Sequence, residues 1–420
     1  MAKIKNIISR QILNSKGEPT IETTVILEDG TYGTASVPTG ASKGSFEAKE
    51  LRDNNSNVYQ GLGVLNAISN IQTEVLPAIT GMEAEHQQDI DRKMIELDGT
   101  ADKSRLGANA ILSVSMAVSK AAAKSFSLPL FLHLKQFIRS SEANIKIPTP
   151  LFNEINGGMH SQSGSMDFQE FLVIPASSMS FSQGLEMSTK IYSSLKKLLL
   201  NNNLSTLIAD EGGFSPKLGS NQDALVLLKQ AVEAISLRLG FDVFFGMDIA
   251  ANKIFADGKY HIKDKSGDLS SDNLIDFYET LNNDYHFLYL EDGLNENDWE
   301  GWSKLCTRLS EQTLIVGDDL TVTNPQRLQA AISKKAITGI IVKPNQIGTV
   351  IESLAVIQMA KQAGIKVTVS HRSGETNDDF IADFAVAASA DYCKFGAPQR
   401  GERIAKYNRL LQIEQQIKSL

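Results

Sequence analysis

The sequence contains little cysteine and no long apolar run. Its two cysteines, Cys306 and Cys393, form no CxxC pair, so neither a disulfide scaffold nor a cysteine zinc site is predicted. Nowhere do about 18 apolar residues follow one another, so we expect no membrane-spanning helix. The start "MAKIKNIISRQ" lacks the apolar segment of a signal peptide, and the final "KSL" is not the peroxisomal "SKL". We therefore expect a cytoplasmic protein.

An excess of basic charge is also missing. The formal net charge of -8 argues against a general nucleic-acid surface, although an acidic protein can still hold a locally basic pocket. The chain of 420 residues is long enough for two domains, and 42% hydrophobic residues suffice for substantial cores. These bounds agree with an intracellular enzyme.

Short apolar runs that end in ionisable groups recur through the second half of the chain. Helical patterns lie between them, such as the one from Leu225 to Leu239, which we expect to stop at Gly240, and those that begin at Asn324 and Thr349. This alternation, over roughly 250 residues, is typical of a closed β/α barrel whose active site lies at the strand C-termini. The seven runs are "TLIADEGG" with Asp210 and Glu211, "VFFGMD" with Asp248, "HFLYLEDG" with Glu291 and Asp292, "LIVGDD" with Asp318 and Asp319, "TGIIVK" with Lys343, "KVTVSHRSG" with His371, Arg372 and Ser373, and "DYCKFG" with Lys394.

One acidic residue stands at the other end of its strand. Glu170 precedes the apolar run Phe171 to Ile174 instead of following it. A strand that begins at the active-site face must run antiparallel to the others, and Pro150 to Ile155 supplies its neighbour. We therefore predict a barrel that opens with two antiparallel strands.

The first part of the chain has a different pattern. Alternating residues predict strands at Ile4 to Leu13, Thr20 to Leu27 and Thr31 to Pro38, and a long helix from Ser104 to Phe126 follows. The polar "RSSEANIK" indicates a linker. The predicted fold class is α/β, with an N-terminal α+β capping domain at 1–138, a linker at 139–147 and a TIM-like β/α barrel at 148–420.

The strand-end acids suggest a metal site. Asp248, Glu291 and Asp318 supply only oxygen ligands, which favour a hard cation such as Mg²⁺ over zinc. Any one of them alone is more often a solvated loop acid. Three on consecutive strands favour the metal, because like charges so close need a cation between them.

The cationic strand ends suggest the chemistry beside that metal. A lone lysine such as Lys343 is more often a surface residue, but next to a divalent ion and Lys394 its pKa should fall towards that of a working base. Arg372 suits a carboxylate or phosphate. His160 and His371 are about as often structural as catalytic. The residues alone predict magnesium-assisted proton abstraction next to a substrate carboxylate, with an acid on the opposite side.

Eleven segments resemble the enolase (phosphopyruvate hydratase) family, in that family's order and across essentially the whole chain. No single segment is decisive, but together they make a specific match. They are "GASKGSFEAKELRD", "LGANAIL", "INGGMH", "QEF", "DEGGFSP", "GMDIA", "LEDGLNENDWEGW", "GDDLTVTNP", "KPNQIG", "SHRSGETNDDFIAD" and "KFGAPQRGER".

The resemblance implies a glycolytic and gluconeogenic lyase that reversibly dehydrates 2-phosphoglycerate to phosphoenolpyruvate with Mg²⁺. It implies that Asp248, Glu291 and Asp318 hold the first ion, and that Ser42 helps bind a second, which arrives with substrate. In the same way it implies that Lys343 removes the C2 proton.

The resemblance also implies the acid side and the substrate contacts. Glu211 and Glu170 would assist departure of hydroxide from C3, with His160 as a further catalytic residue. Lys394 would bind the substrate carboxylate. The implied substrate-binding residues are His160, Glu170, Lys343, His371, Arg372, Ser373 and Lys394. A homodimer or higher homo-oligomer is implied too, as is an additional cell-surface or secreted presence in some relatives.

The chain departs from the family's usual pattern at several positions, which bear on the lid loops, on the turn after "LED" and on dimer contacts. These are Lys43 for a usual threonine, Gly293 for a usual proline, Phe395 for a small residue, a segment from His160 to Glu170 that is one residue longer, and Gln412 where an arginine commonly meets Glu22.

Two alternative functions remain open. A related hydroxy-acid dehydratase would keep the metal acids but should lack a complete phosphate set, whereas Arg372 and Ser373 are present. A non-catalytic binding scaffold would tolerate loss of Lys343 or Glu211, and neither is lost.

Overall fold

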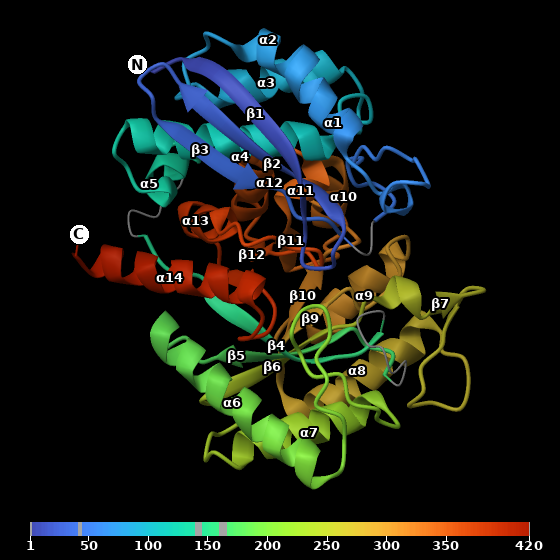
Figure 1. Ribbon diagram of the computed structural model, residues 1–420. Helices are drawn as coiled ribbons and strands as arrows, with labels where there is room; N and C mark the ends of the chain where they lie inside the picture. Colours follow the sequence, from blue (N-terminus) through green and yellow to red (C-terminus); the bar gives the residue numbers. More distant parts are fainter. Residues whose placement is uncertain (1, 41–43, 139–144, 159–165, 420) are drawn as a thin grey trace.

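The computed structural model describes residues 2–40, 44–138, 145–158 and 166–419. It consists of an N-terminal α+β domain and a closed barrel, with the sheet and helices of the first domain lying above the barrel in Figure 1. The N-terminal strands are β1 (Ile4–Leu13), β2 (Pro19–Leu27) and β3 (Tyr32–Ser36), and the helices are α1 (Leu65–Asn70), α2 (Leu76–Ile79), α3 (Gln87–Asp98), α4 (Ala108–Ser125) and α5 (Leu130–Lys135). The predicted N-terminal strands and the long helix are confirmed.

The antiparallel sheet of this domain packs on α4. Nearly every residue of this helix is buried, and most are alanine, serine or valine, which let the sheet approach closely. Gly33 on β3 marks the closest contact, because a Cβ at this position would lie 2.3 Å from the backbone nitrogen of Ala121.

The barrel is closed by eight strands, in the order β10-β11-β12-β13-β4-β5-β6-β9. β5 runs antiparallel to both neighbours, so that Glu170 lies opposite Asn156 on one side and Asp248 on the other. The remaining neighbours are parallel. The two antiparallel strands predicted to open the barrel are therefore confirmed. The strands are β4 (Thr149–Asn156), β5 (Glu170–Pro175), β6 (Val243–Asp248), β9 (Phe287–Glu291), β10 (Leu314–Gly317), β11 (Gly339–Val342), β12 (Lys366–Ser370) and β13 (Tyr392–Lys394).

Helices surround the barrel. Those predicted to begin at Asn324 and Thr349 are confirmed, because each of these residues caps a helix with its side chain. A small hairpin, β7 (Phe255–Ala256) with β8 (Lys259–Tyr260), projects from one side. The helices are α6 (Phe181–Asn201), α7 (Asn221–Glu233), α8 (Ser271–Tyr285), α9 (Trp299–Leu309), α10 (Pro325–Ser333), α11 (Pro344–Ile347), α12 (Val350–Gln362), α13 (Phe380–Ala387) and α14 (Gly401–Ser419).

Two local predictions are wrong. The run "TLIADEGG" is not a barrel strand, because β5 already lies between β4 and β6 and pairs with both. Around this run the described residues form only isolated bridges, between Ile208 and Phe214 and between Ile155 and Phe214. The helix expected to reach Gly240 ends at Glu233, since Ser236 takes a left-handed turn while the apolar spacing continues.

The N-terminal domain is bonded directly to the barrel. The first two amides of α12 donate to its side chains: Val350 to Ser115 Oγ and Ile351 to Asp91 Oδ2, each at 3.1 Å. Elsewhere Lys120 lies 2.8 Å from Asp378. These contacts fix the first domain over the barrel face that carries the charged strand ends.

Glu154 is a buried carboxyl on the outer side of β4. Ser188 Oγ of α6 donates to its Oε1 at 2.7 Å, while Oε2 has no hydrogen-bond partner among the described residues. Burial raises the pKa of Glu154 to about 8. The folded protein therefore holds this side chain protonated at neutral pH.

Glu154→Gln should remove a pH-dependent loss of stability. An unfolded glutamate ionises near pH 4.5 and the folded one near pH 8, so the wild-type free energy of unfolding falls across this window, by up to about 1.4 kcal/mol per pH unit. The free energy of unfolding, measured with denaturant at pH 5 and pH 8, checks this. Relative to wild type, the value for the variant should be higher at pH 8 than at pH 5 by at least about 1 kcal/mol. The exposed control Glu300→Gln should show no such trend, and a pH-independent difference for Glu154→Gln would contradict the assignment.

Candidate active site

The predicted site residues meet in one cavity at the carboxyl ends of the barrel strands. Gln169 and Ser370, which were not predicted, also line it. Glu291 does not line the cavity, but it is buried and pairs with Lys394, which does. Ser42 and His160 fall outside the described residues. The predicted residues that line the cavity are Glu170, Glu211, Asp248, Asp318, Lys343, His371, Arg372, Ser373 and Lys394.

Strand geometry explains why residues so distant in sequence meet here. Asp248, Glu291 and Lys394 are the last residues of β6, β9 and β13, and the parallel strands bring these ends to one rim. Lys343 directly follows β11. Glu170 joins them as the first residue of β5 because that strand is antiparallel.

Lys394 lies at the centre of an acidic group. Its Nζ is 2.8 Å from both Glu170 and Asp248 and 2.9 Å from Glu291. Burial would lower the pKa of the Lys394 ammonium, but these carboxylates outweigh it and raise the pKa well above its usual range. Burial, followed by the charge of Asp248, raises the pKa of Glu291 to about 8. These acids therefore need a cation nearby.

Lys343 forms the second cationic contact, an ion pair with Asp318. Burial opposes the charged form of the lysine, but Asp318 outweighs burial and the pKa of Lys343 is raised. The lowered pKa was predicted for Lys343 beside a divalent ion and stays a prediction, because the raised pKa reflects direct pairing with Asp318 and not the neighbourhood of a metal ion. Gln346 Nε2 also donates to Asp318, at 3.2 Å.

Glu170, Glu211 and His371 form one wall of the cavity, with ligand atoms within 4.8 Å of one another. Burial, and next the charge of Glu211, raises the pKa of Glu170 well above its usual range. Asn153 donates to Glu211 at 3.2 Å. A carboxyl that keeps its proton in this wall can act as an acid.

Arg403 orients His371. Its Nη1 donates to His371 Nδ1 at 2.8 Å, so this nitrogen accepts and Nε2 carries the proton, 3.7 Å from Glu211. Burial, and next the charge of Arg403, lowers the pKa of His371 well below its usual range. Arg403 also donates to the carbonyls of Arg372, Ser373 and Asp210, so it joins two loops of the site.

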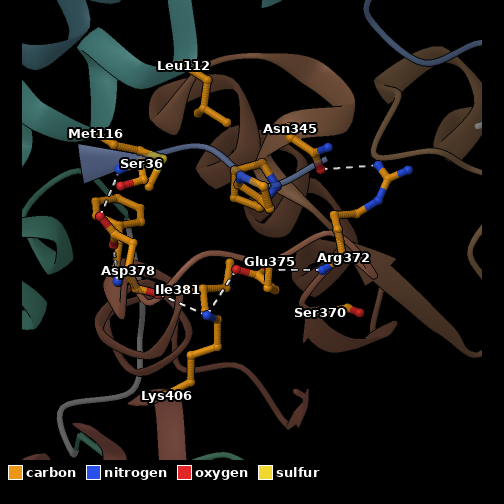
Figure 2. A pocket seen from close by; sticks show the side chains of 13 residues that line it. Ser36, Leu112, Met116, Asn345, Ser370, Arg372, Glu375, Asp378, Ile381 and Lys406 are labelled. Carbon is orange, nitrogen blue, oxygen red and sulfur yellow. Dashed lines mark hydrogen bonds and ion pairs between the residues drawn. The ribbon is translucent and has the colours of Figure 1, made fainter. Parts of the chain in front are cut away.

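The Arg372 guanidinium is buried at the inner edge of the cavity. It pairs with Glu47 of the N-terminal domain at 3.0 Å. Burial would lower the pKa of Arg372, but Glu47 outweighs it and the pKa is raised. Arg372 also borders a second, more apolar cavity between the domains, which Figure 2 shows.

The acids of the site could bind a metal. Asp248, Glu291 and Asp318 present buried carboxylate oxygens and no sulfur or nitrogen, which fits a hard divalent cation. Among the described residues they are not gathered within 4.8 Å of one another, since Asp318 turns to Lys343. The groups that are so gathered are Glu170 with Glu211 and His371, Asp292 with Asp318 and Asp319, and Glu83 with Glu85 and His86.

Glu47, Gln346 and Arg403 were missed by the sequence reading. All three lie inside the motifs that carried the resemblance, but none follows a buried strand, which was the signal used to select candidates. Glu47 offered a signal only once the N-terminal domain was placed against the barrel, whereas Gln346 and Arg403 belong to the barrel itself.

The unusual positions have ordinary surroundings where the structure describes them. Phe395 is buried with its ring 6.1 Å from that of Tyr407, and Gly293 accepts a hydrogen bond from Tyr278 at 2.9 Å. Gln412 accepts from Arg409 and Glu22 pairs with Arg10. Lys43 and most of the segment from His160 to Glu170 lie outside the described residues.

Among the helices of the described residues, none combines the length and the apolar character that a membrane span needs.

Comparison with protein families gives two matches in chain order. Residues 4–134 match the model of the enolase N-terminal domain, and residues 144–420 match that of the enolase C-terminal TIM barrel domain. Together they span nearly the whole chain, and the fold agrees with both. The chain therefore belongs to the enolase family.

Proposed function

We propose that this protein is a phosphopyruvate hydratase, a lyase that reversibly dehydrates 2-phosphoglycerate to phosphoenolpyruvate. The observation that carries the proposal is that one cavity is lined by Lys343, by the carboxyl pair Glu170 and Glu211, and by the cationic side chains of Lys394 and Arg372. A base, an acid and two cationic groups for a carboxylate and a phosphate are what this elimination requires.

Mg²⁺ would be held by Asp248, Glu291 and Asp318, with Ser42 contributing to a second ion that arrives with substrate. Bound Mg²⁺ supplies positive charge for the negative charge that a carboxylate gains when its α-proton leaves. Lys394, already surrounded by carboxylates, would turn to the substrate carboxylate.

Lys343 is the base in this proposal. Its ammonium must first release a proton, and the Asp318 pairing opposes that release. Since Asp318 is also a proposed metal ligand, ligation would weaken this pairing and favour the neutral amine. The neutral Nζ then accepts the C2 proton.

The acid side, Glu170 and Glu211, would complete the reaction. The proton that Glu170 and Glu211 share would pass to the C3 hydroxyl as the C3–O bond breaks, so that water leaves and the carboxyl pair keeps the negative charge. His160 would assist here. Arg372, Ser373 and His371 would contact the phosphate end, which favours a phosphate ester over the unphosphorylated acid of a related dehydratase.

We extend the proposal to a cytoplasmic homodimer or higher homo-oligomer acting in glycolysis and gluconeogenesis. Because Gln412 stands where an arginine commonly meets Glu22, a dimer of this chain would rest on other contacts.

Chelation should abolish activity. We expect excess EDTA to stop formation of phosphoenolpyruvate, followed by its ultraviolet absorbance, and added Mg²⁺ to restore it, because oxygen ligands alone bind the required cation. EDTA already saturated with Mg²⁺ is the control. Full turnover in excess free chelator would exclude this mechanism.

Lys343→Ala should lose both dehydration and exchange of the C2 proton with deuterated solvent, by roughly 100-fold or more, the usual scale for a positioned base. NMR of 2-phosphoglycerate in deuterium oxide measures the exchange. Magnesium-dependent substrate binding must first be shown in the variant. Robust exchange would remove Lys343 from the role of base.

Glu211→Gln should separate the two steps. If Glu211 assists only loss of the C3 hydroxyl, we expect dehydration to fall by roughly 100-fold while C2 exchange stays measurable, since the carbanion can form and return. Equal loss of both rates, with substrate binding intact, would assign Glu211 to proton abstraction instead.

A further inference from the structure

We propose that Glu47 of the N-terminal domain is a positioning residue that fixes the plane of the Arg372 guanidinium for a phosphate group. This inference rests on the proposed function, which gives Arg372 its anionic ligand. Glu47 itself acts through Arg372.

The contact between the two side chains is bidentate. Arg372 Nη1 donates to Glu47 Oε2 at 3.0 Å and Nη2 donates to Oε1 at 3.3 Å. Nη1 also donates to Asn345 Oδ1 at 3.2 Å, which Figure 2 shows as a dashed line. Parallel bonds of this kind fix both the direction and the plane of a guanidinium.

Burial makes this contact rigid. The side chains of Arg372 and Glu47 are only 5% and 7% exposed. The carboxylate is itself held on its own loop, because the Gly44 amide donates to Oε1 at 3.0 Å. Gln346 Nε2 donates to the same oxygen at 3.3 Å.

Gly40 of the N-terminal domain also lies next to the guanidinium, on the side of Nη2 and Nε. A Cβ on Gly40 would lie 1.8 Å from Arg372 Nη2 and 2.8 Å from Nε. The Gly40 backbone therefore lies close beside the guanidinium that Glu47 holds, and a side chain at this position would clash with it. Gly40 and Glu47 of the first domain thus both constrain the orientation of Arg372, which belongs to the second domain and lines the cavity.

Glu47 further links this arginine to the proposed base. Gln346 Nε2 lies within hydrogen-bonding distance of both Glu47 and Asp318, at 3.3 and 3.2 Å, and Asp318 pairs with Lys343. A purely structural ion pair between domains would need no such connection to the site.

The test uses the full-length Glu47→Gln variant and inorganic phosphate as the probe. Isothermal titration in Mg²⁺ should show the phosphate Kd rising about 10-fold, the scale of one hydrogen bond to a charged group, while KM for 2-phosphoglycerate rises by a similar factor and kcat changes less. Glu352→Gln is the matched control, because it removes a carboxylate that pairs with Lys103 across the same domain interface at 3.0 Å. This control should bind phosphate as wild type does.

A double variant separates positioning from stability. Added to Arg372→Lys, Glu47→Gln should cause little further loss of phosphate affinity, because the residue it positions is already changed. Losses that add, or an unchanged Kd in Glu47→Gln, would overturn the proposal. If Glu47→Gln fails to fold, Glu47→Asp is the second variant. It keeps the negative charge but moves the carboxylate away from Arg372, so the same loss of phosphate affinity is expected. Wild-type protein that binds no phosphate would instead reject the phosphate role of Arg372, and with it this inference.

Discussion

The Lys394 ammonium between Glu170, Asp248 and Glu291 is the interaction on which the active-site end of the barrel depends. Three carboxylates buried so close together would repel one another strongly in the absence of positive charge. The barrel brings them there because strands that pack side by side end at one rim. Lys394 comes from β13, across the barrel from β6 and β9, so the counter-charge also ties opposite sides of the barrel together.

Charge compensation continues outward from this centre. Lys343 compensates Asp318, and Arg372 is compensated in turn by Glu47. Each cation is placed so that its partner is an acid from a different element. Positive and negative side chains therefore alternate through the site. An anion or a cation that binds there would replace an ion pair already formed within the protein. Binding of an anion should therefore affect binding of a cation, and the reverse.

Much of this arrangement could be read from the sequence, because a buried strand that ends in a charged residue is a local pattern. The reversed position of Glu170 gave the antiparallel strand in the same way. The strand pattern placed Glu211 at the end of a barrel strand, which is wrong because its segment forms only isolated bridges among the described residues, whereas the resemblance implied its place in the site. The pairing of Lys343 with Asp318 and that of Arg372 with Glu47 could not be predicted, because they depend on which side chains meet across elements and domains.

The capping of α12 by the N-terminal domain has a consequence for how the protein unfolds. Ser115 and Asp91 accept from the first two amides of this barrel helix, groups that helices ordinarily satisfy with their own caps or with water. Detaching the first domain would leave those two amides without their acceptors and would remove from the buried Asp91 the amide of Ile351, one of its hydrogen-bond donors. The two domains, although distinct in architecture, are thereby joined into one cooperative unit, and a barrel separated from its cap would begin to fray at the start of α12.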